Sequence, residues 1–251
     1  MSIAAGGLTA PEWLASSPGQ YIVAREQAYF DEAVADIFGY HALQLGLEQL
    51  DLLRASRIPL RVHAGPQGNV GLRADFRDLP IDSNSVDLMV LPHTLEFSAH
   101  PHQVVREVAR VLRPEGHVII SGFNPLSLWG LRRGFGARRD FPWSGDFIHL
   151  ARVKDWFALV GLEIVAGSMA CYAPPCIEQK WLDRFGFMEK AGDRWWPIAG
   201  GVFFLQAIKR VRGIRLILPK WSDRAAPQKN LSPVPERVRD EEGMAAKVRS
   251  E

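Results

Sequence analysis

The chain has 251 residues, of which 47% are apolar and 23% charged, the composition of an ordinary folded protein rather than a disordered or fibrous one. Its net charge of +2 gives no argument for nucleic acid as a partner. The two cysteines, Cys171 and Cys176, lack the spacing of a metal or redox site, and no apolar run approaches the roughly 20 residues of a membrane span. Because the N-terminus also lacks a signal-peptide pattern, we expect a cytoplasmic protein with no metal site and no transmembrane segment.

The predicted elements begin with a helix within residues 22–38. Apolar side chains recur there at helical spacing, before a glycine that commonly ends a helix: Phe30, Val34, Ile37, Phe38 and then Gly39. The pattern next predicts a strand HALQL, a helix EQLDLLRAS, a strand PLRVHA and a weaker strand VGLRAD, at 41–45, 48–56, 59–64 and 70–75. Helices and strands therefore alternate from the start of the chain.

The pattern is clearer from residue 86 onward. Two nearly continuous apolar strands, at 86–91 and 117–123, flank a helix at 101–112, as expected where both faces of a parallel sheet are covered. A helix at 152–160, a strand at 162–167, a helical stretch at 177–191 and a last strand at 201–209 follow. The segment 124–149 is rich in glycine, arginine and aromatic residues, and we expect a long functional loop there.

Strands that alternate with helices predict an α/β fold with a doubly wound, mostly parallel sheet. We divide the chain into an N-terminal helical lead-in at 1–38, one domain at 39–221 and a tail at 222–251. The tail has six basic and six acidic residues, three prolines and no aromatic residue, so we expect it to be disordered.

Residues 74–120 carry a series of short motifs in a recognisable order: AD, LP, SVDLMV, HTLE, REVARVLRPEG and VIISGF. This series resembles the core of the class I, S-adenosylmethionine-dependent methyltransferases of the methyltransferase type 11 group, and the similarity extends over roughly residues 38–212. The resemblance implies a seven-stranded Rossmann-like sheet, S-adenosylmethionine as cofactor, and transfer of its methyl group to a small-molecule acceptor.

The resemblance also implies roles for residues that follow two strands. Asp75 would accept a hydrogen bond from the adenine amino group, with Phe76 as its apolar or backbone contact, although Asp75 is alternatively a polar turn residue. Leu91, Pro92 and His93 would border the methionine half of the cofactor. His93 could shape the pocket, orient a nucleophile or remove its proton, or it could be a histidine hydrogen-bonded in a strand-end loop.

The turn LQLGLEQL departs from the glycine-rich turn of the family. Gly46 is retained, and Gln44 stands in place of the family's acid; we expect both to contact the cofactor. Glu48 and Leu50 stand in place of two glycines. Only 29 residues separate Gly46 from Asp75, too few for two helices, so we expect the helix between strands 2 and 3 to be missing. The ribose-binding acid is also missing, and its substitute would be His63 or Gln67. These departures leave open an alternative function, a catalytically inactive methyltransferase-like binding or scaffold protein.

The basic and aromatic segment 124–149 supplies the candidate substrate contacts Trp129, Arg132 and Arg133. Arginine pairs hold phosphate or carboxylate groups, and arginines among aromatic side chains also suit a stacked nucleic-acid base or an anionic membrane surface. The alternative is a solvated basic loop whose aromatic side chains pack inward. The sequence thus leaves the partner of this segment undecided.

Overall fold

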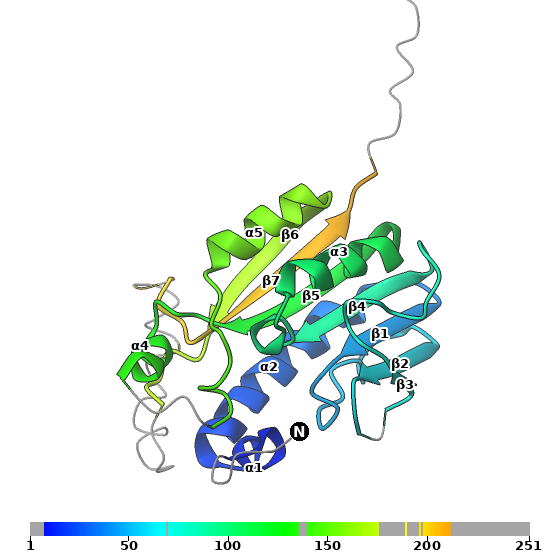
Figure 1. Cartoon of the computed structure of the whole chain (residues 1–251). Helices are drawn as coiled ribbons and strands as arrows, with labels where there is room; N and C mark the ends of the chain where they lie inside the picture. The colour runs from blue at the N-terminus through cyan, green and yellow to red at the C-terminus, as the bar shows by residue number, and fades with distance from the viewer. Residues whose placement is uncertain are drawn as a thin grey trace, which may run out of the picture. The chain divides into compact units, whose positions relative to one another are not determined.

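Seven strands form one mixed sheet in the computed structural model of the chain, in the order β3-β2-β1-β4-β5-β7-β6 (Figure 1). The structure describes residues 8–68, 70–135, 140–175, 189, 196 and 198–211. The strands are β1 (His41–Leu45), β2 (Leu60–Gly65), β3 (Leu72–Arg73), β4 (Val86–Pro92), β5 (Leu112–Phe123), β6 (Leu162–Ala170) and β7 (Val202–Lys209). The first five strands of this order, from β3 to β5, pair in parallel. Strand β7 runs antiparallel to both β5 and β6. This confirms the predicted doubly wound, mostly parallel sheet of seven strands.

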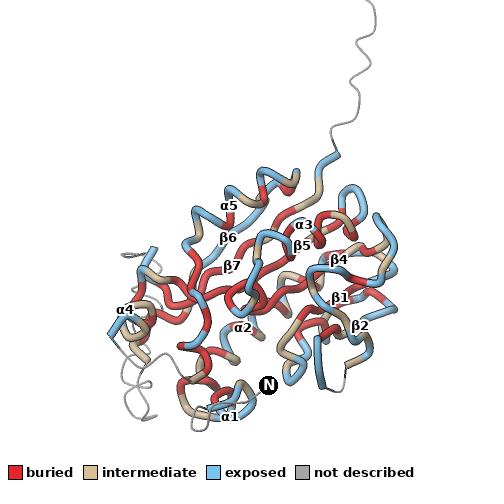
Figure 2. Tube along the Cα trace, in the orientation of Figure 1, coloured by how far each residue is buried: buried red, intermediate tan, exposed pale blue. Residues whose placement is uncertain are grey.

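The central strands are apolar because both faces of the sheet are covered. Every residue of β4 except Asp87 is buried, and β5 is buried from Val118 to its end (Figure 2). In register, Leu43 of β1 lies beside Met89 of β4, which in turn lies beside Val118 of β5. A continuous apolar run therefore marks the centre of the sheet, as expected for parallel strands.

Helices α3 (Pro101–Val111) and α5 (Leu150–Leu159) cover one face of the sheet, and α2 (Ser17–Ala35) covers the other (Figure 1). Val104, Val108 and Phe157 belong to the core on the first face. Phe30 and Val34 of α2 belong to the core on the second face. The short helix α1 (Ala10–Leu14), the 3-10 turn η1 (Leu95–Phe97) and α4 (Leu128–Phe135) complete the elements of the described residues.

The helix expected at 48–56 does not form, and this prediction was wrong. The connection from β1 to β2 is a series of turns, closed by hydrogen bonds such as Leu50 N–H to the Leu47 carbonyl and Ser56 N–H to the Leu53 carbonyl. Leu52 and Leu53 are buried in the same core cluster as residues of α2. Helix α2 therefore fills the face that a helix between β1 and β2 would otherwise cover. The described residues between β2 and β3 also hold no helix, as predicted.

Three other expectations need adjustment. The first long helix spans Ser17–Ala35 rather than 22–38, the third strand has only two residues, and the segment 124–149 contains helix α4 rather than loop alone. The predicted helix at 177–191, apart from Glu189, and the tail at 222–251 lie outside the described residues. Among the described helices, none has both the length and the apolar character that crossing a bilayer requires.

Candidate functional site

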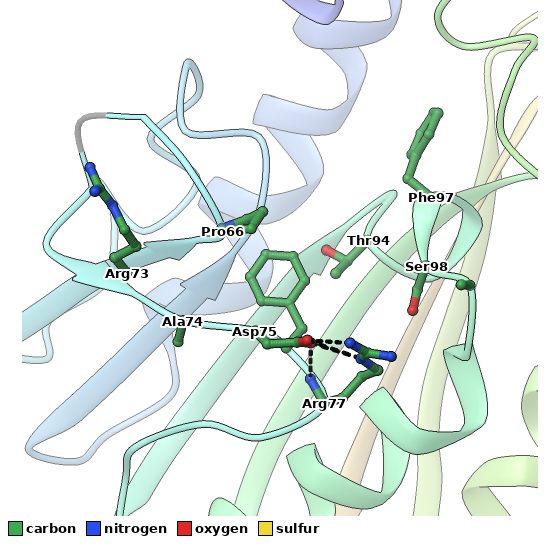
Figure 3. A pocket seen from close by; sticks show the side chains of 10 residues that line it. Pro66, Arg73, Ala74, Asp75, Arg77, Thr94, Phe97 and Ser98 are labelled. Atoms are coloured by element: carbon green, nitrogen blue, oxygen red, sulfur yellow. Dashed lines mark hydrogen bonds and ion pairs between the residues drawn. The ribbon is translucent and has the colours of Figure 1, made fainter. Parts of the chain in front are cut away.

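A cavity of about 680 Å³ lies beyond the carboxyl ends of β2, β3 and β4. Pro66, directly after β2, borders it, as do residues 73–77 at and after β3, Thr94 after β4, and residues 97–99 before α3 (Figure 3). The strand order reverses between β1 and β4, and ligands of open α/β sheets bind at this kind of switch point. The position of the cavity is thus the one where the fold would hold a ligand.

The turn after β1 places Gly46 beside Thr94 and Phe76, two residues that line the cavity. Gly46 has a φ of +81°, which glycine adopts at little cost. A Cβ at this position would lie 3.3 Å from Thr94 Oγ1, and the Thr94 hydroxyl itself donates a hydrogen bond of 2.5 Å to the Leu45 carbonyl. Gly46 therefore allows the β1 turn and the end of β4 to approach each other closely.

Gln44 organises the turn rather than the cavity. Its buried Nε2 lies 2.7 Å from the Leu50 carbonyl and 3.2 Å from the carbonyls of Gly46 and Leu47. Its Oε1 accepts a hydrogen bond of 3.0 Å from the Leu52 amide. An acid could not donate to these carbonyls, so the amide at position 44 suits this particular turn.

Neither Glu48 nor Leu50 is among the ten residues that line the cavity. Leu50 packs against the core cluster that contains Leu52, and Glu48 is exposed. The Glu48 carboxylate occupies the space that a Cβ would need at Gly68, in the loop after β2. His63, one predicted substitute for the ribose-binding acid, lies 3.4 Å from Asp51 Oδ1 through its Nε2.

Asp75 and Phe76 both line the cavity, but the Asp75 carboxylate already has a cationic partner. Both of its oxygens accept from the Arg77 guanidinium, and Oδ1 also accepts from the Arg77 amide at 2.9 Å (Figure 3). The hydrogen bonds from the Arg77 side chain and backbone lower the pKa of Asp75 to about 2. Asp75 is therefore ionised at neutral pH, and its oxygens retain room for another donor.

Leu91 and Pro92 do not reach the cavity, because both are buried in the sheet at the end of β4. His93 is also buried, with a side chain 3% exposed, between two carboxylates. Its Nδ1 lies 2.9 Å from Glu96 Oε2, and its Nε2 lies 2.9 Å from Glu26 Oε1.

Burial would lower the pKa of His93, but the charges of Glu26 and Glu96 and their contacts with the ring raise it to about 10. The ring also stacks on Phe123, with 4.2 Å between centroids. An imidazolium at neutral pH has no free nitrogen lone pair to accept a proton. This geometry therefore favours the alternative in which His93 is a histidine held in a strand-end loop, here by Glu26 and Glu96, over the role of a base.

The three predicted substrate contacts of α4 are used within the protein. Trp129 is fully buried and donates to the Ala173 carbonyl at 2.9 Å. Arg132 donates to the Pro175 carbonyl at 2.6 Å. Arg133 donates to the Gly145 carbonyl at 2.7 Å and pairs with Asp146. These contacts favour the interpretation in which aromatic side chains of this segment pack inward, as Trp129 and Trp143 do, with Phe135 as an exception at 88% exposed. Arg138 and Arg139 lie outside the described residues.

Several residues of this region were not predicted from the sequence, among them Thr94, Arg77, Glu26 and Glu96. Glu26 carries the clearest signal, because it lies on the stripe of α2 that also contains Ile22 and Phe30, at intervals of four residues. A charged residue on a buried helical stripe indicates a buried partner. Arg77 has a weaker signal, its spacing of two residues from Asp75, which is common in turns.

Residues 40–120 match the family model described as a methyltransferase domain. An uncharacterised protein of Escherichia coli (strain K12), YafS, is 35% identical over 135 residues, which are 53% of this chain and 56% of that protein. An uncharacterised methyltransferase of Mycobacteroides abscessus is 32% identical over 102 residues, 34% of this chain and 38% of that protein. The chain thus spans little more than half of the length of YafS and less than half of the length of the Mycobacteroides protein.

The fold is also that of solved methyltransferases. A SAM-dependent methyltransferase from Thermotoga maritima, described as a possible histamine N-methyltransferase, superposes with a TM-score of 0.57 at 14% identity. The superposition covers 76% of this chain and 93% of the Thermotoga chain. At this identity, the likeness concerns the fold alone. The family-model match over residues 40–120 and this fold together support the resemblance to the class I S-adenosylmethionine-dependent methyltransferases.

Proposed function

We propose that this protein transfers a methyl group from S-adenosylmethionine to a small-molecule acceptor. The observation that carries the proposal is the cavity at the ends of β2, β3 and β4, which the unusual side chains of the β1 turn leave free. A cofactor space filled by Glu48 or Leu50 would have argued for a protein that has lost the cofactor. Leu50 instead packs into the core, and Glu48 turns toward the loop after β2.

The residues at one end of the cavity fit the adenosine part of the cofactor. Asp75 offers an ionised acceptor for the adenine amino group, and Phe76 offers an apolar ring. Gly46 keeps the β1 turn free of a side chain where it meets Thr94. When bound, the cofactor supplies an electrophilic methyl group on sulfur, and this chain contributes mainly by positioning the reactants and excluding water.

The ribose side of the cavity departs from the family. No Asp or Glu lies between Asp51 and Asp75 in the sequence, so β2 ends without an acid. The Glu48 carboxylate approaches the same loop at Gly68 from the β1 turn. Glu48 nevertheless does not line the cavity, and His63 faces Asp51, so we assign no charged acceptor for the ribose hydroxyls.

The opposite end of the cavity is the candidate acceptor side. Phe97 and Ser98 of this end offer an aromatic ring and a hydroxyl. The Phe97 ring stacks on Phe141, with 4.9 Å between centroids, so its face is held in place. A small acceptor with an apolar or aromatic part would suit this wall.

Titration calorimetry with S-adenosylhomocysteine tests the cofactor assignment. We expect the wild-type protein to bind it, and Asp75→Asn to bind roughly 10-fold more weakly, because a charge-assisted hydrogen bond becomes a neutral one. Asp155→Asn, on the distant helix α5, is the matched control and should bind like the wild type. The absence of wild-type binding at millimolar ligand would overturn the proposal.

A second candidate function is a methyltransferase-like binding protein without catalysis. Two observations favour it: the turn is closed by Gln44, and the Asp75 carboxylate is already paired with Arg77. Binding of S-adenosylhomocysteine by the wild type would count against loss of the cofactor. Methyl transfer from labelled S-adenosylmethionine into a metabolite extract would then separate the enzyme from a binding protein that retains the cofactor.

A further inference from the structure

A second cavity, of about 400 Å³, lies at the opposite ends of the strands from the candidate site. Residues at the beginnings of β1, β2 and β4 line it, whereas the candidate site borders the carboxyl ends of the parallel strands. Its volume is within the range of roughly 300–1,000 Å³ that small-molecule sites have. We call it the amino-end pocket. Its walls include Leu43, Val62 and Leu72, and its rim includes His41, Asp82 and Ser85.

The amino-end pocket is open because no helix of the described residues lies over this part of the sheet. Helices α3 and α5 cover the same face over the other half of the sheet (Figure 1). Val62 and Leu72 pack against the core of that face but are only partly buried. Gly71 adds no side chain, and a Cβ at its position would lie 3.4 Å from Val62 Cγ1. Apolar side chains of the sheet are thereby left open to a ligand.

The polar groups at the rim of the pocket offer hydrogen-bond acceptors. The His41 ring donates from Nδ1 to the Ser85 carbonyl at 2.9 Å, so the Nε2 of the neutral ring is left as an acceptor. The Ser85 hydroxyl donates to the Asp82 carbonyl at 2.6 Å and keeps its lone pairs. Within the part of the chain that the structure describes, the Asp82 carboxylate has no hydrogen bond and no ion pair. A ligand that satisfies this rim must therefore donate.

The charge at the rim is negative. Asp82 is the one acidic residue among those that line the pocket, and none of them is a lysine or an arginine. Arg110 is the cation whose charge interacts with Asp82, but its guanidinium is held by Glu107 through hydrogen bonds of 2.6 and 2.9 Å. Because Glu107 balances Arg110, the Asp82 charge is left for a ligand to balance.

We propose that the amino-end pocket binds a small molecule that combines an apolar body with a primary amine. The body would pack on Val62 and Leu72, and the ammonium would donate to the Asp82 carboxylate and its neighbouring acceptors. An ammonium has three donors and no acceptor, which matches a rim that accepts. A carboxylate or phosphate suits the pocket less well, because it would meet the Asp82 charge and bring no donor.

Titration calorimetry of the full chain tests the proposal with hexylamine, hexanol and hexanoate, which share an alkyl body. Hexylamine should bind roughly 10-fold more tightly than hexanol, because its hydrogen bond to Asp82 is charge-assisted, and hexanoate should bind most weakly. Asp82→Asn should lose this preference for the amine and keep its affinity for hexanol. Asp78→Asn is the matched control, because Asp78 is exposed in the same connection from β3 to β4 but does not line the pocket.

Gly71→Leu should abolish binding of both hexylamine and hexanol, because the new side chain would fill the space beside Val62. Unchanged thermal unfolding of this variant shows that it remains folded. Three outcomes would overturn the proposal: no binding of hexylamine at millimolar concentration, equal affinity for hexylamine and hexanoate, or unchanged hexylamine affinity in Asp82→Asn. Competition by S-adenosylhomocysteine would also overturn it, by assigning the amine to the candidate site. The proposal does not depend on methyl transfer, so either can fail alone.

Discussion

Glu26 of α2 and His93 at the end of β4 form a buried ion pair, with 2.9 Å between Glu26 Oε1 and His93 Nε2. Among the described residues, neither Glu26 oxygen has a hydrogen-bond partner, so the imidazolium is what balances the Glu26 charge. His93 has a φ of +50° and precedes Thr94 of the cavity wall. The pair therefore joins the N-terminal helix to the turn that shapes the candidate site.

Replacement of His93 by Gln should destabilise the protein strongly. It would leave Glu26 and Glu96 buried without a counter-charge, and removing one partner from a buried ion pair costs about 3–5 kcal/mol. Urea unfolding measures the loss, and His102→Gln, at an exposed position of α3, is the control. Glu26→Gln should cost less, because Glu96 still pairs with His93. A loss below about 1 kcal/mol for His93→Gln would show that the pair is not formed.

The same histidine predicts how stability depends on pH. His93 has a pKa of about 10 in the folded protein against 6.5 for an ordinary histidine. Between these values the folded state keeps a proton that the unfolded state releases, so the free energy of unfolding should fall as pH rises. The stabilisation is complete below pH 6.5 and is lost as pH passes through 10. Chemical unfolding across this range should show a steeper decline in the wild type than in His93→Gln. Parallel curves would contradict the raised pKa.

Strands were more predictable than helices in the first 75 residues. β1 and β2 lie where their sequence patterns indicated. β1 is buried from Ala42 to Leu45, as expected for a central parallel strand, whereas β2 is buried only at Ala64 and Gly65. Leu50, Leu52 and Leu53 also looked helical, but a series of turns buries Leu52 and Leu53 and leaves Leu50 partly buried against the same core. Helix α2, which precedes β1, already covers this face of the sheet. That competition arises in tertiary structure, so the local pattern could not disclose it.

The location of the candidate site was more predictable than the roles of its side chains. Asp75 and Phe76 line the cavity because the ends of parallel strands converge at one edge of the sheet. Leu91 and Pro92 were expected there too, yet Thr94 is the residue of that segment that reaches the cavity. The positive φ of His93 redirects the chain between them, and a backbone angle of this kind leaves no sequence pattern.

Gln44→Glu, a change to an acid like the one in the family's turn, should destabilise this protein. The carboxylate could still accept from the Leu52 amide, but it would face the carbonyls of Gly46, Leu47 and Leu50 without a proton to donate. Buried acceptors left without partners predict a loss of about 2–4 kcal/mol in the free energy of unfolding. Gln49→Glu, at an exposed position of the same turn, should change stability little. Equal stability of Gln44→Glu and the wild type would contradict the role assigned to the amide.

Gly46→Ala should weaken both folding and binding of S-adenosylhomocysteine. An alanine at a φ of +81° costs about 1–2 kcal/mol, and its Cβ would lie 3.3 Å from Thr94 Oγ1. The matched control is Gly134→Ala in α4, where a Cβ meets no atom within 4 Å, so this change should stabilise the helix by about 0.5–1 kcal/mol and leave binding unchanged. Thermal unfolding should show that Gly46→Ala is less stable, and Gly134→Ala more stable, than the wild type. Calorimetry should show weaker binding of S-adenosylhomocysteine for Gly46→Ala alone. A neutral Gly46→Ala would mean that the turn adopts another conformation in solution.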